Sequence, residues 1–215
     1  MAHSSRAKLR AAVTGEPYQL AAEWIADHGL AGGLVPHAQL PAQQLAEAAV
    51  LVALARPNVL PVLAPPGTLY ALAGAEPSLD QLTLRPAADY AAAVLARLLP
   101  AQAGGHICGV PLLRTGKATN TTISLRLLAS GMEGVHLSIR ATRAHRLQAE
   151  RLQAEAGLAP LWAGQGAGGG EPAAWQDLAR SLAGSQPRWS QALRRPPSSV
   201  QPAPTGAHPP PPSLR

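Results

Sequence analysis

Two short runs in which apolar and polar residues strictly alternate constrain the fold of this chain most. Alternation with a period of two is typical of β-strands that have one buried face. The runs stand close together in the sequence, so we expect them to pair as an antiparallel hairpin. The apolar positions are Ile123, Leu125 and Leu127 in the first run and Val135, Leu137 and Ile139 in the second.

The hairpin register follows from the condition that both apolar sets face the same core. Residues that pair directly must then have an even sum of residue numbers. A loop of three or five residues centred near Gly131 meets this condition. Residues 107–113 are expected to add a third strand, and Pro111 would place that strand at an edge of the sheet.

Helices are expected both before and after this hairpin in the sequence. Residues 4–56 read as three helices, broken near Gly15 and at Gly29, and the third runs from Pro41 to about Arg56. Its stretch 48–55 is apolar on all sides, which indicates burial. Two more helices are expected, one between two prolines at 86 and 100 and one over residues 142–156.

The end of the chain has a different composition. Residues 187–215 hold nine prolines, four arginines and no acidic residue, which favours disorder. Before them lies an apolar stripe too short to be stable alone. A segment that folds on docking to a partner and drift in a dispensable tail explain this stripe equally well. The docking interpretation predicts that deleting residues 160–215 leaves the core folded but abolishes partner capture. The expected docking residues are Trp175, Leu178, Leu182 and Trp189.

Together these patterns predict an α+β fold. It would have an N-terminal helical unit (residues 1–56), a Pro/Gly-rich connector (57–81) and an α+β core (82–157). The core would be a helix-packed antiparallel β-hairpin or three-stranded sheet. Residues 158–215 would form a largely disordered, Pro-rich, basic C-terminal tail with short amphipathic segments.

The positive net charge is compatible with binding to nucleic acid but does not establish it. The chain carries a net charge of +6, and most of its basic residues are arginine, which binds phosphate bidentately. Codons rich in G and C produce the same excess of arginine, alanine and proline, so composition is weak evidence for function. The single cysteine excludes an internal disulfide. No apolar run is long enough to span a bilayer, so we expect a cytoplasmic protein without membrane contact.

Three sequence motifs resemble catalytic or binding sites, but in each case a purely structural explanation is favoured. Residues 114–119 resemble a phosphate-binding loop, but Pro111 and Ala118 stand where the pattern needs Gly and Ser/Thr, so a polar hairpin turn is favoured. A pair made of Cys108 with His106 or His136 lacks the further ligands of a zinc site. We therefore expect no cofactor, no metal and no enzymatic activity.

The third motif is the pair of helices around Gly15, which has helix-turn-helix spacing. Its second helix carries Glu23 and Asp27, whose charge repels phosphate. A plain helical hairpin is therefore the favoured interpretation.

Three function hypotheses are compatible with these residues, and the least favoured is an enzyme that uses Cys108 with a histidine as a nucleophilic pair. Two others are favoured over it. The first is an accessory protein without an active site that acts through protein–protein contacts of the tail; its partner is unknown. The alternative is a nucleic-acid-associated protein that uses the outward face of the hairpin and arginines within residues 126–151, together with the basic tail. Its expected contacts are Arg126, Arg140, Arg143 and Arg146. A solvated strand face without function explains the same arginines, and RNA-binding sheets normally add stacking aromatics that are absent from these strands.

Overall fold

The computed structural model describes residues 2–29, 33–56, 60, 68, 70–164 and 166–195. It has an α+β fold with N-terminal helices, a five-stranded mixed sheet and a small three-stranded sheet. The helices are α1 (Ala2–Thr14), α2 (Tyr18–His28), α3 (Pro41–Ala55), α4 (Ala91–Leu98), α5 (Arg143–Glu155), α6 (Glu171–Leu182) and α7 (Gln186–Arg194). The strands are β1 (Leu72–Pro77), β2 (Gln81–Pro86), β3 (Ala101–Ala103), β4 (His106–Cys108), β5 (Leu113–Ala118), β6 (Ile123–Leu127), β7 (His136–Ile139) and β8 (Ala159–Pro160).

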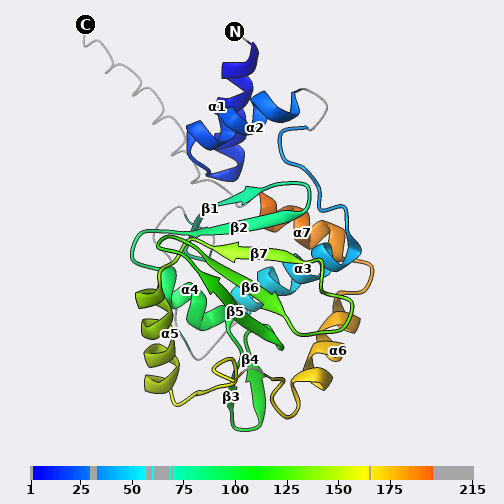
Figure 1. Ribbon diagram of the computed structural model, residues 1–215. Helices are drawn as coiled ribbons and strands as arrows, with labels where there is room; N and C mark the ends of the chain where they lie inside the picture. The colour runs from blue at the N-terminus through cyan, green and yellow to red at the C-terminus, as the bar shows by residue number, and fades with distance from the viewer. Residues whose placement is uncertain are drawn as a thin grey trace, which may run out of the picture.

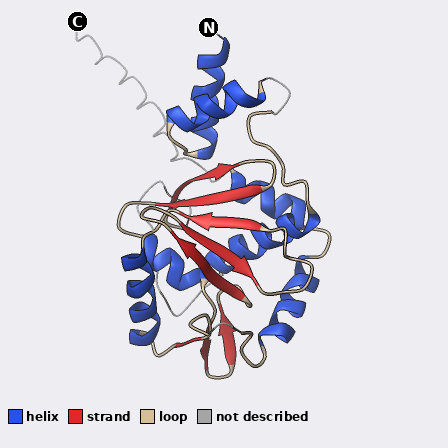
Figure 2. Ribbon diagram, in the orientation of Figure 1, coloured by secondary structure: helices blue, strands red, loops and turns tan. Residues whose placement is uncertain are grey.

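The helices are unevenly distributed around the large sheet. Figure 1 shows α3 and α4 behind the sheet, α5 along one side, α6 and α7 along the other, and α1 with α2 beyond β1. The small sheet, in the order β4-β3-β8, lies below the large one. Figure 2 shows the same view coloured by secondary structure, with no described helix in front of the large sheet.

The hairpin predicted from the alternating runs is confirmed. Strands β6 and β7 are antiparallel, and Ile123 pairs with Ile139 and Leu125 with Leu137, as the even-sum rule requires. The connection over residues 128–135 is longer than the three or five residues predicted. Two successive turns build it, closed by hydrogen bonds from the amides of Met132 and Val135 to the carbonyls of Ala129 and Met132.

The large sheet extends well beyond this hairpin, in the order β1-β2-β7-β6-β5. Strand β2 runs parallel to β7, and β1 joins β2 antiparallel at the edge. The sequence analysis placed β1 in a connector and started a helix at Pro86, where β2 ends. The two prolines of this hairpin, Pro77 and Pro86, are the last residues of their strands, so their missing N–H groups interrupt no strand interior.

The predicted third strand over residues 107–113 was wrong. Strand β4 stops at Cys108, and β5 starts only at Leu113. Between them Gly109 and Leu112 have positive φ angles of 79° and 65°, which turn the chain out of an extended conformation. Pro111 therefore lies in a loop between strands.

The main core lies between the large sheet and the helices behind it. Leu82, Leu84, Leu95 and Leu98 are fully buried there. Helix α3 is buried over most of its length, as its apolar sequence predicted. The sequence analysis grouped α3 with the first two helices, but α3 belongs to the main core. Helices α1 and α2 instead have a small separate cluster, made of Ala7, Ala21, Trp24 and Ile25.

The α1–α2 hairpin is held to the edge of the sheet by a close backbone contact and a buried ion pair. A Cβ atom on Gly15 would lie 2.2 Å from the carbonyl oxygen of Ala73 in β1, so only glycine fits. Arg10 pairs with Glu16, and the Arg10 Nη2 donates to the carbonyl of Pro77 at 2.8 Å. The Arg10 guanidinium also lies 4.0 Å above the ring of Trp24.

Two helices form in the region that the sequence analysis expected to be largely disordered. Each is joined to the core by a buried Arg–Glu pair: Arg114 of β5 to Glu171 of α6, and Glu47 of α3 to Arg194 of α7, both with N–O distances of 2.6 Å. Trp175, Leu178 and Leu182 are part of the main core cluster. Most of the Pro-rich end, residues 196–215, lies outside the described residues, as do residues 57–59 and 61–67 of the connector.

Within the described ranges, no helix has the length and apolar character needed to cross a membrane.

Candidate functional site

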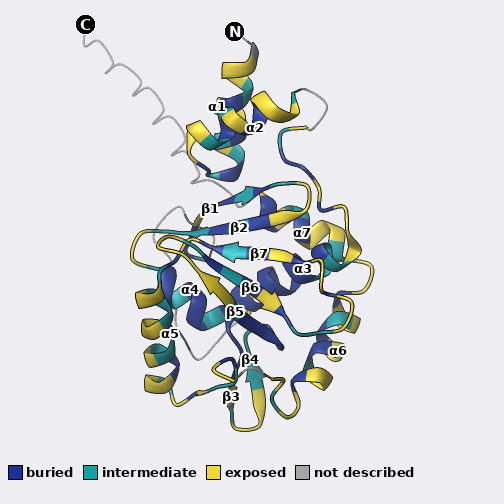
Figure 3. Ribbon diagram, in the orientation of Figure 1, coloured by how far each residue is buried: buried dark blue, intermediate teal, exposed yellow. Residues whose placement is uncertain are grey.

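The side of the large sheet opposite α3 and α4 is not covered by a described helix. On β6, Ile123, Leu125 and Leu127 are buried, whereas Ser124 is half-buried and Arg126 is exposed. Strand β7 alternates in the same way, with His136 exposed between buried neighbours. Figure 3 shows this side of the sheet facing the viewer, with exposed and half-buried segments on β5, β6 and β7. We call it the open face.

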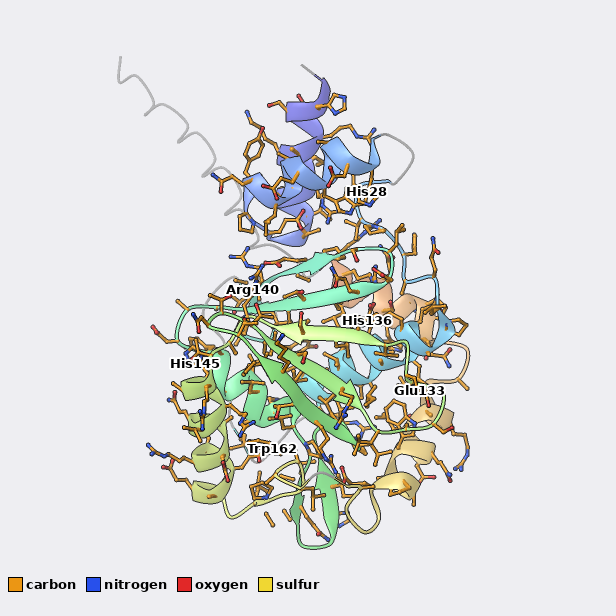
Figure 4. All side chains as sticks on the ribbon, viewed as in Figure 1. His28, Glu133, His136, Arg140, His145 and Trp162 are labelled. Carbon is orange, nitrogen blue, oxygen red and sulfur yellow. The ribbon has the colours of Figure 1, made fainter. Side chains whose placement is uncertain are left out.

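The open face contains a shallow hollow of about 520 Å³ across β2, β7, β6 and β5. Its floor is polar and partly ordered by hydrogen bonds, such as the one between Thr83 Oγ1 and Ser138 Oγ at 2.7 Å. In Figure 4, Glu133 and His136 lie toward one end of β7 and Arg140 toward the other. The polar and charged residues that line the hollow are Gln81, Lys117, Ser124, Arg126, Glu133, His136 and Ser138.

The cations of the hollow are largely unpaired. Neither Lys117 nor Arg126 makes an ion pair within the described part of the chain. Glu133 is the acidic residue of the hollow, and its Oε1 accepts a hydrogen bond from the amide of Gly131 at 3.2 Å. Lys117 and Arg126 therefore give the open face positive charge that no ion pair within the described residues neutralises.

A smaller pocket of about 230 Å³ adjoins the hollow where β5 meets α5. Arg126 lines both cavities, which are therefore neighbours. Arg146, half-buried on α5, also lines the smaller pocket, and its guanidinium carbon lies 5.9 Å from the ring centre of Trp162. We call this cavity the arginine pocket; Figure 4 labels Trp162.

The third arginine of this pocket, Arg114, has its charge matched within the fold. Its Nη2 lies 2.6 Å from Glu171 Oε2, and both side chains are almost completely buried. Burial alone would raise the pKa of Glu171, but hydrogen bonds from Arg114 and from the amides of Gly168 and Leu112 outweigh it and lower that pKa below 4.5. The carboxylate therefore stays ionised, and the pair is neutral overall.

The remaining predicted contacts, Arg140 and Arg143, lie apart from this pocket. Arg140 pairs with Glu76 at 2.7 Å, and Arg85 approaches the same carboxylate at 3.5 Å. The hydrogen bond to Glu76 raises the pKa of Arg140 and keeps it protonated, and the Glu76 carboxylate balances part of its charge. Arg143 is exposed at the first position of α5. Of the four predicted contacts, the structure brings together only Arg126 and Arg146.

A second surface hollow, of about 440 Å³, lies beside Arg140 and includes His145. The amide of Thr142 donates to His145 Nδ1 at 3.1 Å, and the Thr142 side chain accepts from the amide of His145, so the two residues cap the start of α5. Because Nδ1 is an acceptor here, it carries no proton in this arrangement. The helix cap is therefore sufficient to explain the position of the His145 side chain.

Three of the four predicted docking residues are packed inside the fold. Trp175, Leu178 and Leu182 are at most 7 % exposed, so none presents a free apolar surface. Trp189 on α7 is 40 % exposed and remains accessible.

The remaining motifs are placed without forming a reactive cluster. His106 and Cys108 lie on β4 of the small sheet, whereas His136 lies on β7 of the large one. Within the described ranges, no group of three or more His, Cys, Asp or Glu residues is arranged to hold a metal.

The segment that resembled a phosphate-binding loop was expected to be a hairpin turn. It forms strand β5 instead, and the turn follows at residues 119–122. Because a turn was expected here, the position of Lys117 on the open face was not predicted from the sequence. Trp162 was also missed, since nothing in its local sequence indicates that it packs beside Arg146.

Searches of protein-family models, of curated proteins and of solved structures returned no match to this chain.

Proposed function

We propose that this protein binds single-stranded nucleic acid through the sugar–phosphate backbone on the open face of its large sheet. The observation that carries the proposal is the unpaired positive charge of Lys117, Arg126 and Arg146 around two neighbouring cavities. Three cations along a polar surface suit a chain of phosphates, because each contact releases a condensed counterion.

Two features favour a single strand over a duplex. The hollow crosses four strands and carries unpaired cations, and a positively charged groove can follow the backbone of a single strand. Helix α2, the candidate for insertion into a duplex groove, exposes Glu23 and Asp27, which repel phosphate. Among the described residues, no Phe, Tyr or Trp lines the hollow, so binding would depend mainly on phosphate contacts and show little sequence preference.

The alternative function, an accessory protein that docks partners through its C-terminal region, is supported by a single described side chain, the exposed Trp189. The other three docking candidates are core residues. The open face offers several convergent groups and is therefore the stronger candidate. Neither function requires catalysis.

The proposal is tested by fluorescence anisotropy with labelled single-stranded DNA and RNA at increasing salt concentration. With three phosphate contacts, the slope of log K against log[salt] is expected to be about −2. The Arg126→Ala variant should weaken binding of every sequence alike and reduce the slope by about 0.7. Arg180→Ala serves as the control, because Arg180 is exposed on α6 and already paired with Asp177. Absence of binding to both DNA and RNA at low salt would refute the proposal.

A further inference from the structure

The arginine pocket differs from the rest of the open face in being small and rigidly built. Trp162 forms one wall, and its indole Nε1 donates to Gln153 Oε1 at 2.7 Å. Gln153 is fully buried and donates in turn to the carbonyls of Ala96 and Leu99, at 2.8 and 2.9 Å, at the end of α4. The Trp162 ring is therefore held in place, with the Arg146 guanidinium carbon 5.9 Å from its centre.

The opposite wall is Arg114, which is held from three sides. It donates to Glu171, to the carbonyl of Gly166 at 2.6 Å and to the carbonyl of Leu113 at 3.0 Å. A cavity with fixed donors binds a ligand without the cost of ordering its own side chains.

Two donors in this pocket lack acceptors. The Nε atoms of Arg114 and Arg146 are both buried and have no hydrogen-bond partner in the described part of the chain. A buried donor without an acceptor is costly. A bound phosphate group would present several acceptor oxygens within the same pocket.

The net positive charge of the pocket indicates which kind of phosphate group would bind there. The pair of Arg114 with Glu171 is neutral, so Arg126 and Arg146 leave about two positive charges on the pocket walls. A phosphomonoester carries about −1.5 to −2 at pH 7, whereas each phosphodiester inside a strand carries a single negative charge. Two arginines around one small cavity therefore match a terminal phosphate better than an internal one.

We infer that the arginine pocket binds the terminal phosphate of a nucleic-acid strand whose backbone lies along the open face. This inference rests on the proposed function and adds to it a preference for strands that end in a phosphomonoester. Thr115, whose Oγ1 lies 3.4 Å from Arg146 Nη1, orients the Arg146 fork toward the pocket.

The test uses the full chain and three oligonucleotides of one sequence, carrying a 5′-phosphate, a 3′-phosphate or hydroxyls at both ends, compared by competition anisotropy. One of the phosphorylated strands is expected to bind about tenfold more tightly than the hydroxyl form, since charge-assisted hydrogen bonds are the strong ones. Arg126→Ala should remove most of this preference. Arg146→Lys, which keeps the charge but loses the guanidinium fork, should reduce it.

Arg143→Ala is the matched control, because Arg143 is an exposed arginine of the same helix that does not line the pocket. Circular dichroism of each variant checks that the fold is intact. Equal binding of all three oligonucleotides would overturn this inference and leave the proposed function standing. No binding of any of them would overturn the proposed function itself. Preferential binding of a phosphoserine peptide, with the same dependence on Arg126 and Arg146, would assign the pocket to a phosphorylated protein and overturn both.

Discussion

Replacing Glu47 with alanine is expected to lower the free energy of unfolding by about 3–5 kcal/mol, because it leaves a charged arginine buried without a counterion. Glu47 and Arg194 are both inaccessible to solvent. The Arg194 Nε and Nη2 donate to the two carboxylate oxygens of Glu47 at 2.7 and 2.6 Å. Ser190 and Gln43 donate to the same carboxylate at 2.6 and 2.8 Å, so the substitution also removes their acceptor.

Urea unfolding followed by circular dichroism measures this effect. The control is Asp177→Ala, which removes an exposed ion pair with Arg180 and should change stability by less than about 1 kcal/mol. The double variant Glu47→Leu with Arg194→Met should recover much of the loss, since well-packed apolar residues replace buried ion pairs at little cost. A loss below about 1 kcal/mol in Glu47→Ala would show that α7 does not pack on α3 as described.

Ending the chain after residue 170 is expected to abolish cooperative unfolding of the whole protein. The truncation removes α6 and α7, and with them Trp175, Leu178, Leu182 and Leu193 from the core. It also leaves Glu47 and Arg114 without their buried partners. Two uncompensated charges, at about 3–5 kcal/mol each, together are comparable with the total stability of a typical domain, about 5–15 kcal/mol.

The comparison chain ends after residue 195, which keeps both helices and removes only residues outside the described part. It should melt cooperatively, close to the full-length protein, in a thermal scan followed by circular dichroism. The sequence-based expectation was that loss of residues 160–215 would leave the core folded. Equal melting temperatures for the two truncated chains would restore that expectation and contradict the packing of α6 and α7.

The elements with a regular apolar period were predictable from the sequence. The register of β6 and β7 follows from alternation alone, since Ile123 and Ile139 must share a face. The buried helix α3 was recognisable because its centre is apolar all round. These signals are local, and each depends on fewer than about twenty neighbouring residues.

The C-terminal helices were not predictable because long-range ion pairs fix them. Glu47 and Arg194 are 147 residues apart in sequence, and nothing near either residue indicates the other. In α7, a proline at the second position and several polar residues make the segment resemble a tail, although Pro187 is compatible with a helix start. Its buried residues are Ser190, Leu193 and Arg194, a set without an apolar period.

The candidate site was predictable only in part, for a related reason. The outward position of Arg126 follows from strand alternation, which correctly gave an exposed side chain. Arg140 has an even residue number like Arg126, so it was also expected on the outward face. It pairs there with Glu76 of β1, a strand that the sequence did not predict. Trp162 and Arg146 come together only through the fold of α5 and β8, so no sequence pattern could identify the arginine pocket.

The most direct test of the central claim is a two-dimensional amide NMR titration of the full chain with a short single-stranded oligonucleotide at low salt. The account predicts shift changes concentrated at Lys117, Arg126, His136 and Arg146, with the amides of α2 and α7 unchanged. Changes centred on Trp189 and α7, or no changes at any residue, would contradict it.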